Sequence, residues 1–222
     1  MTYRWNFGPV WENADVLLRG AFGTLRLFAI CALAGLLLGL LIGLARQSPR
    51  GWLRWPATAF VEFFRNTPVL VQILWFYFAL PILAPFEISP LAAAALGISL
   101  NSAAFTAEIV RGGIASIDRG QWEAARALGM TGAQAMRRIV LPQALRRMLP
   151  ALTNRGIEIF KMSTLASAVA YVELLQQGKL LASLNFNPIE TYTVIAVIFF
   201  LCLLPLVQAT YWLERRLGRA DA

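Results

Sequence analysis

Residues 120–148 read GQWEAARALGMTGAQAMRRIVLPQALRRM, and they form the only long polar segment in a chain that is otherwise strongly apolar. Asp118, just before this stretch, belongs to a residue type that caps helix N-termini, and Gln121 has the spacing that helps to close such a cap. Gly129 predicts the end of this first helix, because glycine most easily adopts a left-handed C-terminal conformation. The segment is therefore expected to begin with a short, well-delimited helix.

This first helix is expected to have about ten residues and a length of about 15 Å. Trp122, Ala125, Arg126 and Gly129 follow the i, i+3, i+4, i+7 pattern and are predicted to share one face. The alanines around them would let another surface approach the backbone closely. From the residues alone, two interpretations stay open: a docking element for a partner protein, or a helix that lies on lipid headgroups.

A second helix is predicted to follow directly after the turn. Thr131 and Gln134 have the capping-box spacing, which satisfies two backbone donors reciprocally at a helix start. Pro142 is expected to interrupt this helix, because proline lacks a backbone donor and its ring clashes with the preceding turn.

A family resemblance rests on seven positions of this stretch: Glu123, Ala124, Ala125, Gly129, Ile139, Leu141 and Pro142. They resemble the EAA loop of ABC importer permeases, and the continuation 143–147 is similar to the polar amino acid branch of that family. In such permeases the loop forms a coupling helix that sits in a cleft of the ATP-binding subunit. The resemblance assigns ATPase coupling to Glu123, Ala124, Ala125, Ala127 and Gly129.

The composition indicates a membrane protein. Of the 222 residues, 58% are hydrophobic and only 14% are charged, which is far from the average of soluble proteins. The net charge is +8, and in a membrane protein such an excess marks cytoplasmic loops. Cys31 and Cys202 lie in apolar runs and are expected to be buried small side chains without a disulfide or a metal. The absence of histidine from the sequence removes the commonest metal ligand and general base.

The apolar runs predict five membrane spans, at about residues 20–45, 57–84, 88–110, 156–177 and 191–213. The span at 156–177 is the weakest, because Glu158, Lys161 and Glu173 interrupt it. The polar loop at about 111–150 separates the third and fourth spans, and the whole chain, 1–222, is expected to be a single transmembrane permease domain. Residues 1–15 lack the pattern of a cleavable signal peptide, so the first span is expected to direct insertion.

The distribution of arginine and lysine predicts the orientation. Fourteen arginines follow the first span, occupy the central loop or follow the last span, whereas the other side holds Arg4, Arg19 and Lys179. Positive residues favour the cytoplasmic side. The N-terminus is therefore expected outside, with the central loop and the C-terminus in the cytoplasm, where an ATPase would be.

Three glycines, Gly35, Gly39 and Gly43, form a small-xxx-small ridge in the first span. This ridge predicts close helix packing, either against a helix of the same chain or at a subunit interface. The sequence contains no glycine loop ending in Gly-Lys-Ser or Gly-Lys-Thr, so ATP is expected to bind to another chain. It also contains no dispersed repeat of the kind found in inverted-repeat secondary transporters.

Polar residues within the spans are the candidates for a substrate pathway, because a charge near the bilayer centre costs about 2.5–3.5 kcal/mol unless it has a partner or a wet cavity. These candidates are Glu62, Arg65, Thr67, Asn101, Glu108, Glu158, Lys161, Ser163 and Thr164. The alternative for the charged ones is local pairing: Glu62 with Arg65, Glu108 with Arg111, and Glu158 with Lys161. For Ser163 and Thr164 it is hydrogen bonding to their own helix.

Two of these regions also resemble the family: residues 62–72, like its second helix, and residues 101–113, like its third. Pro68 is expected to bend the helix of the first region. Where relatives have aspartate or asparagine after the lysine, this chain has Met162, which removes one polar group.

The resemblance implies an all-α polytopic membrane protein of the type I ABC importer class, with five transmembrane helices and a cytoplasmic coupling helix. It implies a bacterial inner-membrane permease for polar amino acids, with no enzyme activity and no cofactor of its own. Its expected partners are a second permease (the same chain or a paralogue), cytoplasmic ATP-binding subunits, a periplasmic solute-binding protein and membrane lipid. Two other functions stay open: a membrane scaffold whose basic loop binds lipid or a soluble partner, and a secondary transporter that needs no ATPase.

Overall fold

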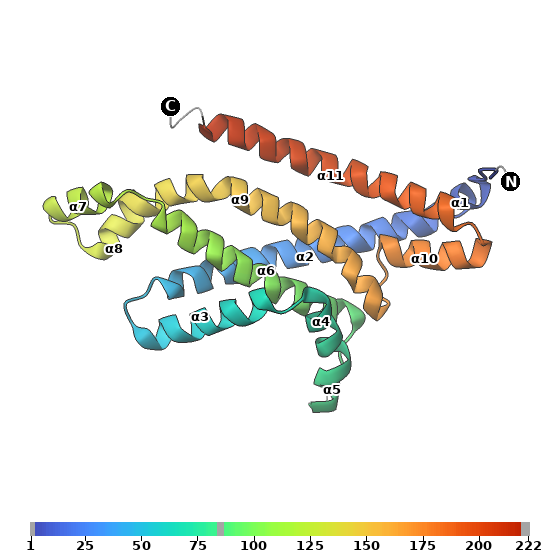
Figure 1. Ribbon diagram of the computed structural model, residues 1–222, viewed down its shortest axis with the longest axis horizontal. Coiled ribbons are helices and arrows are strands. Elements are labelled where there is room, and N and C mark those ends of the chain that lie inside the picture. Colours follow the sequence, from blue (N-terminus) through green and yellow to red (C-terminus); the bar gives the residue numbers. More distant parts are fainter. Residues whose placement is uncertain (1–2, 84–86, 219–222) are drawn as a thin grey trace. The chain divides into compact units, whose positions relative to one another are not determined.

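The computed structural model describes residues 3–83 and 87–218, and within these ranges the chain forms helices and no strands (Figure 1). The elements are α1 (Gly8–Glu12), α2 (Ala14–Arg46), α3 (Gly51–Asn66), α4 (Val69–Leu74), a π-helical turn (Trp75–Ala79), α5 (Leu80–Leu83), α6 (Pro90–Ala115), α7 (Arg119–Ala127), α8 (Gly132–Ala135), a second π-helical turn (Met136–Val140), α9 (Leu141–Met162), a 3₁₀ helix (Ser163–Val169), α10 (Leu174–Asn185) and α11 (Pro188–Gly218). The all-α prediction is confirmed.

Three helices in the described part of the chain, α2, α6 and α11, are long and apolar enough to cross a membrane. The number becomes four if α3 and the pair α4–α5 are counted as one bent span. The predicted spans 20–45 and 191–213 fall within α2 and α11, which extend beyond the predicted limits. In particular, α2 begins at Ala14, six residues before the expected start. Helix α6 begins at Pro90, two residues after the predicted start at 88, and extends to Ala115.

The helix predicted over 57–84 is not continuous. Helix α3 ends at Asn66 and α4 begins at Val69, with Pro68 between them in an extended conformation (φ −59°, ψ 133°). Pro68 was expected to bend a helix, and instead the helix breaks there, because proline disfavours a helical conformation in the residue before it. Residue 84, the end of the predicted span, lies outside the described residues.

The prediction of one helix over 156–177 is wrong. Helix α9 begins at Leu141, inside the predicted loop, and ends at Met162, where a 3₁₀ helix follows. Ala170 then adopts a left-handed conformation (φ 55°), and α10 starts at Leu174. The Glu173 carboxylate caps α10 by accepting from the backbone N–H groups of Leu175 (2.8 Å) and Gln176 (2.6 Å). Glu173, which was expected to interrupt a membrane span, is therefore the N-cap of a separate helix.

The chain divides into two compact units. Unit 1 comprises residues 1–33, 67–99 and 157–206. One buried cluster of this unit includes Leu27, Cys31, Ile73 and Ile98, and a second one gathers Val10, Leu17, Leu174, Leu181 and Ile195. Cys31 is buried in the first cluster, as expected, whereas Cys202 of α11 is only half-buried.

Unit 2 comprises residues 34–66, 100–156 and 207–222. Its core is formed by Val110, Ile114, Ile117, Val140, Ala144 and Met148. The glycine ridge of α2 packs on α6 within this unit. A Cβ atom added to Gly35 would lie 2.5 Å from Ser102 Oγ, and one added to Gly43 would lie 2.7 Å from Val110 Cβ. Of the two interpretations of the ridge, packing within one chain is therefore confirmed.

Candidate functional site

Helix α7, the candidate coupling helix, is capped at both ends by residues of its own segment. Asp118 is the N-cap and accepts a hydrogen bond from the Gly120 N–H at 2.6 Å. At the other end Gly129 has φ +71°, and the Met130 N–H donates to the Ala125 carbonyl at 3.0 Å. This is the hydrogen-bond pattern of a Schellman motif. The start at Asp118 and the end at Gly129 are confirmed. Gln121, which was expected to help close the cap, accepts from Gln143 Nε2 at 3.3 Å instead.

The capping box predicted for α8 is also present. The Thr131 N–H donates to Gln134 Oε1 at 2.9 Å, and the Gln134 N–H donates to Thr131 Oγ1 at 3.3 Å. Pro142, however, does not interrupt the helix, and this expectation is corrected. The backbone stays helical from Gly132 through Met162, and a π-helical turn (Met136–Val140), whose hydrogen-bond register is altered, directly precedes Pro142.

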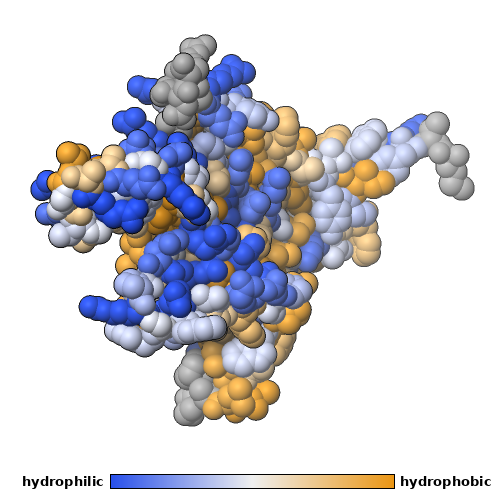
Figure 2. All heavy atoms as spheres, turned by 60° about the vertical axis from the view of Figure 1, so that its left-hand side comes forward, coloured by the Kyte–Doolittle hydropathy of each residue, from blue (hydrophilic) through white to orange (hydrophobic). Residues whose placement is uncertain are grey.

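The two sides of α7 have different environments. Ala125 is fully buried and Trp122 packs against the core of unit 2. Arg126 was expected on the same face and is exposed instead. The exposed side carries the remaining predicted coupling residues: Glu123, Ala124, Ala127 and Gly129. In Figure 2 hydrophilic side chains gather on the face that comes forward, where α7 and α8 lie.

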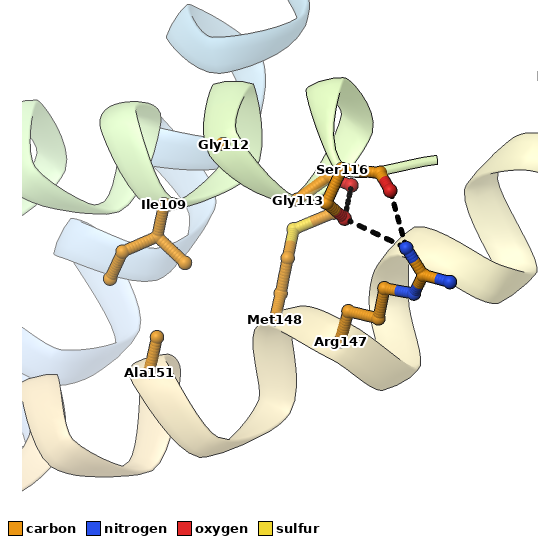
Figure 3. Close-up of a pocket in the computed structure, with 7 residues that line it drawn as sticks. All are labelled: Ile109, Gly112, Gly113, Ser116, Arg147, Met148 and Ala151. Atoms are coloured by element: carbon orange, nitrogen blue, oxygen red, sulfur yellow. Dashed lines mark hydrogen bonds between the residues drawn. The ribbon is translucent and has the colours of Figure 1, made fainter. Parts of the chain in front are cut away.

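The segment α7–α8 is anchored where it leaves α6 and where it joins α9. A groove of about 380 Å³ lies between these two helices, and Figure 3 shows its lining: Ile109, Gly112, Gly113, Ser116, Arg147, Met148 and Ala151. The Arg147 guanidinium donates to the Ser116 carbonyl oxygen and approaches Ser116 Oγ at 3.5 Å. Met148 fills the space beside Gly113, where a Cβ atom would collide with its side chain. The two ends of the α7–α8 segment are thus tied to each other.

A cluster of charges lies in unit 2 around the Glu108 carboxylate. Arg46 of α2 is 2.6 Å from Glu108 Oε2, Arg65 of α3 is 3.6 Å from the same oxygen, and Arg111 of α6 is 2.5 Å from Oε1. The Arg46 side chain is only 10% exposed. One carboxylate therefore connects three helices through ion pairs. The expected pair of Glu108 with Arg111 is present.

A second group, centred on Asn101, is buried beside this cluster. The Asn101 amide donates to the Phe64 carbonyl at 2.8 Å and accepts from Arg155 Nη2 at 2.9 Å. The Arg155 guanidinium lies 4.4 Å from the centre of the Phe105 ring, and that of Arg65 lies 5.3 Å from it. Cations over an aromatic face are attracted by its quadrupole. Phe105 therefore helps to hold two positive charges next to a buried amide.

The structure brings together three of the predicted pathway residues, Arg65, Asn101 and Glu108. It does not pair Glu62 with Arg65: Glu62 is exposed and accepts from the Asn66 amide at 3.2 Å, and Arg65 reaches Glu108 instead. This corrects the expected i, i+3 pair, because a partner on another helix replaces the neighbour on the same helix.

Arg46 of the Glu108 cluster and Arg155 of the Asn101 group were counted only as loop charges in the sequence. Arg155 is 4% exposed. Their partners, Glu108 and Asn101, are 62 and 54 residues away along the chain, so no local spacing reveals these contacts.

The other predicted pathway residues lie in unit 1. The Thr67 carbonyl accepts from the Gln72 amide at 2.9 Å. Ser163 Oγ donates to the Phe160 carbonyl at 2.6 Å, and Thr164 Oγ1 donates to the Lys161 carbonyl at 2.8 Å. Both hydroxyls therefore bond to their own helix, which was the alternative to lining a path. Glu158 and Lys161 are exposed on α9.

Comparisons with known proteins identify the family. Residues 35–219 match the family described as "Binding-protein-dependent transport system inner membrane component". The probable amino-acid ABC transporter permease protein YckA of Bacillus subtilis (strain 168) is 40% identical over 189 residues, which is 85% of this chain and 83% of that protein. The glutamine transport system permease protein GlnP of Escherichia coli (strain K12) is 37% identical over 219 residues, or 98% of this chain and 99% of GlnP.

A solved structure, titled "Crystal structure of an amino acid ABC transporter with histidines", matches with a TM-score of 0.91 at 34% identity. The match covers 96% of this chain and 100% of that chain. The chain therefore belongs to the family of inner membrane components of binding-protein-dependent transport systems.

Proposed function

We propose that this chain is the permease subunit of an ATP-driven importer of polar amino acids, and that it forms part of the translocation pathway. The names of its relatives support the substrate class, since YckA and GlnP are named as amino acid and glutamine permeases. The excess of arginine in the loop that contains α7 supports an orientation with α7 and the C-terminus in the cytoplasm and the N-terminus outside.

The complete transporter would contain partners that supply what this chain lacks. ATP would be bound and hydrolysed by two cytoplasmic subunits, because the sequence has no phosphate-binding glycine loop. The chain itself would therefore be neither an enzyme nor a cofactor-binding protein. A second permease, either a copy or a paralogue, would complete the pathway, and an external solute-binding protein would deliver the amino acid.

The observation that carries the coupling role is the two-sided environment of α7. Its exposed side presents Glu123 with the small side chains of Ala124 and Ala127, which allow close approach of a partner. Its inner side is fixed to the core of unit 2 by Trp122 and Ala125. A pull on α7 by the closing ATPases would pass to α6 and α9 as a rigid-body movement, because the segment is tied at both ends.

The test is co-purification of the permease with its ATPase. Ala127→Trp places a bulky ring on the exposed side of α7, and Ala59→Trp places the same ring on an exposed position of α3. We expect the first variant to lose the ATPase and the second to retain it, with both proteins equally stable. Gly129→Asp is expected to lose the ATPase as well. Equal retention of the ATPase in all variants would refute docking at α7.

The polar groups around Asn101 are proposed to contact the substrate. A zwitterionic amino acid needs a cation for its carboxylate and an acceptor for its ammonium group, which Arg65 and Asn101 of unit 2 could provide. Asn101→Ala is expected to reduce transport while the ATPase stays bound. Because Asn101 also holds Arg155, the thermal stability of the variant must be measured alongside. Transport and ATPase coupling that both remain intact would argue against this role.

A further inference from the structure

Two adjoining hollows lie in unit 1 between the N-terminal segment and α11. They enclose about 310 and 450 Å³ and share Trp11, Val194 and Ile198. The first is completed by residues of α2: Ala14, Leu17, Leu18 and Ala21. The second is completed by Phe7, Thr193, Val197 and Leu201. Because they share three residues, we treat them as one feature and call it the Trp11 groove.

The lining of the Trp11 groove is apolar except for the indole N–H of Trp11, which is 66% exposed, and one hydroxyl. Thr193 carries its only side-chain hydroxyl, and this hydroxyl donates to the Ile189 carbonyl at 2.7 Å. A ligand with polar atoms inside the groove would lose its hydrogen bonds to water without compensation. The interior therefore fits a hydrocarbon chain.

The groove has walls that the N-terminal segment fixes in place. Tyr3 Oη donates to Glu190 Oε2 at 2.7 Å, and the Asn6 N–H donates to Glu190 Oε1 at 2.8 Å. Glu190, in the first turn of α11, is 1% exposed. Val10 of α1 is fully buried in the cluster that contains Leu17. These contacts hold Trp11 beside α11, so the hollow is part of the folded protein.

The position and length of the groove identify its occupant. From Thr193 to Leu201 the lining runs eight residues along α11, or about 12 Å. Half of a hydrocarbon core of about 30 Å is about 15 Å, so the α11 side of the groove covers most of the depth of one leaflet. Trp11 lines both hollows, Trp5 stacks on Phe7 of the lining at 5.5 Å, and both tryptophans are exposed, as side chains at the headgroup level are. We infer that the Trp11 groove binds an acyl chain of a phospholipid from the leaflet in which the N-terminus lies.

The first test measures phospholipid that stays with the purified transporter after detergent exchange, by native mass spectrometry and by phosphorus assay. Ala21→Phe fills the groove, and Ala196→Phe adds the same ring to an exposed position of α11 that does not line it. We expect Ala21→Phe to lose one phospholipid per permease and Ala196→Phe to lose none. Equal retention in the wild type and both variants would overturn the assignment.

The second test follows Trp11 itself. The variant keeps Trp11 and replaces the other six tryptophans by phenylalanine. It is placed in vesicles of phosphatidylethanolamine and phosphatidylglycerol with brominated acyl chains. We expect these chains to quench the Trp11 fluorescence strongly. Adding Ala21→Phe should remove most of this quenching, whereas Ala196→Phe should leave it unchanged. If Trp11 is not quenched, or if Ala21→Phe separates the two permeases of the complex, the groove is a protein contact and the inference fails.

Discussion

Replacing Glu108 by glutamine removes the one carboxylate that Arg46, Arg65 and Arg111 share. Most of the expected loss in the free energy of unfolding comes from the pair with Arg46, because the Arg46 side chain is 10% exposed and lies 2.6 Å from the carboxylate. Removing one partner of a buried ion pair costs about 3–5 kcal/mol. Glu108 is 25% exposed and glutamine can still accept a hydrogen bond, so we take the lower end of that range. The other two arginines are more exposed, at 34% and 45%, and add at most about 1 kcal/mol in total.

The expected destabilisation of about 3 kcal/mol corresponds to a fall in Tm of about 6–12 °C for a chain of this size. The assay is thermal unfolding of the purified permease in detergent. Glu62→Gln is the matched control, because Glu62 is exposed and the same charge is removed with an expected loss below about 0.5 kcal/mol.

A double variant of Glu108→Gln with Arg46→Gln completes the test. If the ion pair is the cause, the double variant is destabilised by clearly less than the sum of the two single variants. Additive losses, or a Glu62→Gln variant as unstable as Glu108→Gln, would refute the reasoning.

Three further predictions concern backbone positions and use the same thermal assay. Gly23→Ala would place a Cβ atom against the Val172 carbonyl oxygen, so we expect a Tm loss of several degrees, whereas Gly112→Ala, with open space around it, should change little. Gly129→Ala keeps the left-handed conformation (φ +71°) at a cost of about 1–2 kcal/mol, seen as a lower Tm without loss of expression. Phe186 is also left-handed (φ 52°) and is 91% exposed. Phe186→Gly is therefore expected to raise the free energy of unfolding by up to about 1 kcal/mol, and a lower Tm would contradict this.

The parts of the structure that depend on neighbouring residues could be predicted from the sequence. Asp118, Gly129 and the pair Thr131–Gln134 act within a few residues of themselves, and their caps appear where expected. The long uncharged runs correctly indicated α2, α6 and α11. The resemblance to ABC importer permeases is confirmed by the family that matches residues 35–219.

The parts that depend on distant residues could not be predicted. The average hydrophobicity of residues 57–84 or 156–177 depends only on composition. It does not show that the backbone leaves the helical conformation at Pro68 or at Ala170. Glu62 and Arg65 have a favourable spacing, yet Arg65 binds a carboxylate brought near only by the fold. For the same reason Arg155, which looks like a loop charge in the sequence, is buried against Phe105.

The self-capped construction of the α7 segment makes it a transferable module. Its N-cap, its Schellman turn and its capping box all come from residues 118–134, so its local shape needs little from the rest of the protein. Only Trp122 and Ala125 must match the host, because they face its core. If the ATPase docks on α7 as we propose, exchange of the outward residues alone, by recombination or by design, would direct a permease to a different ATPase subunit while its folding is preserved.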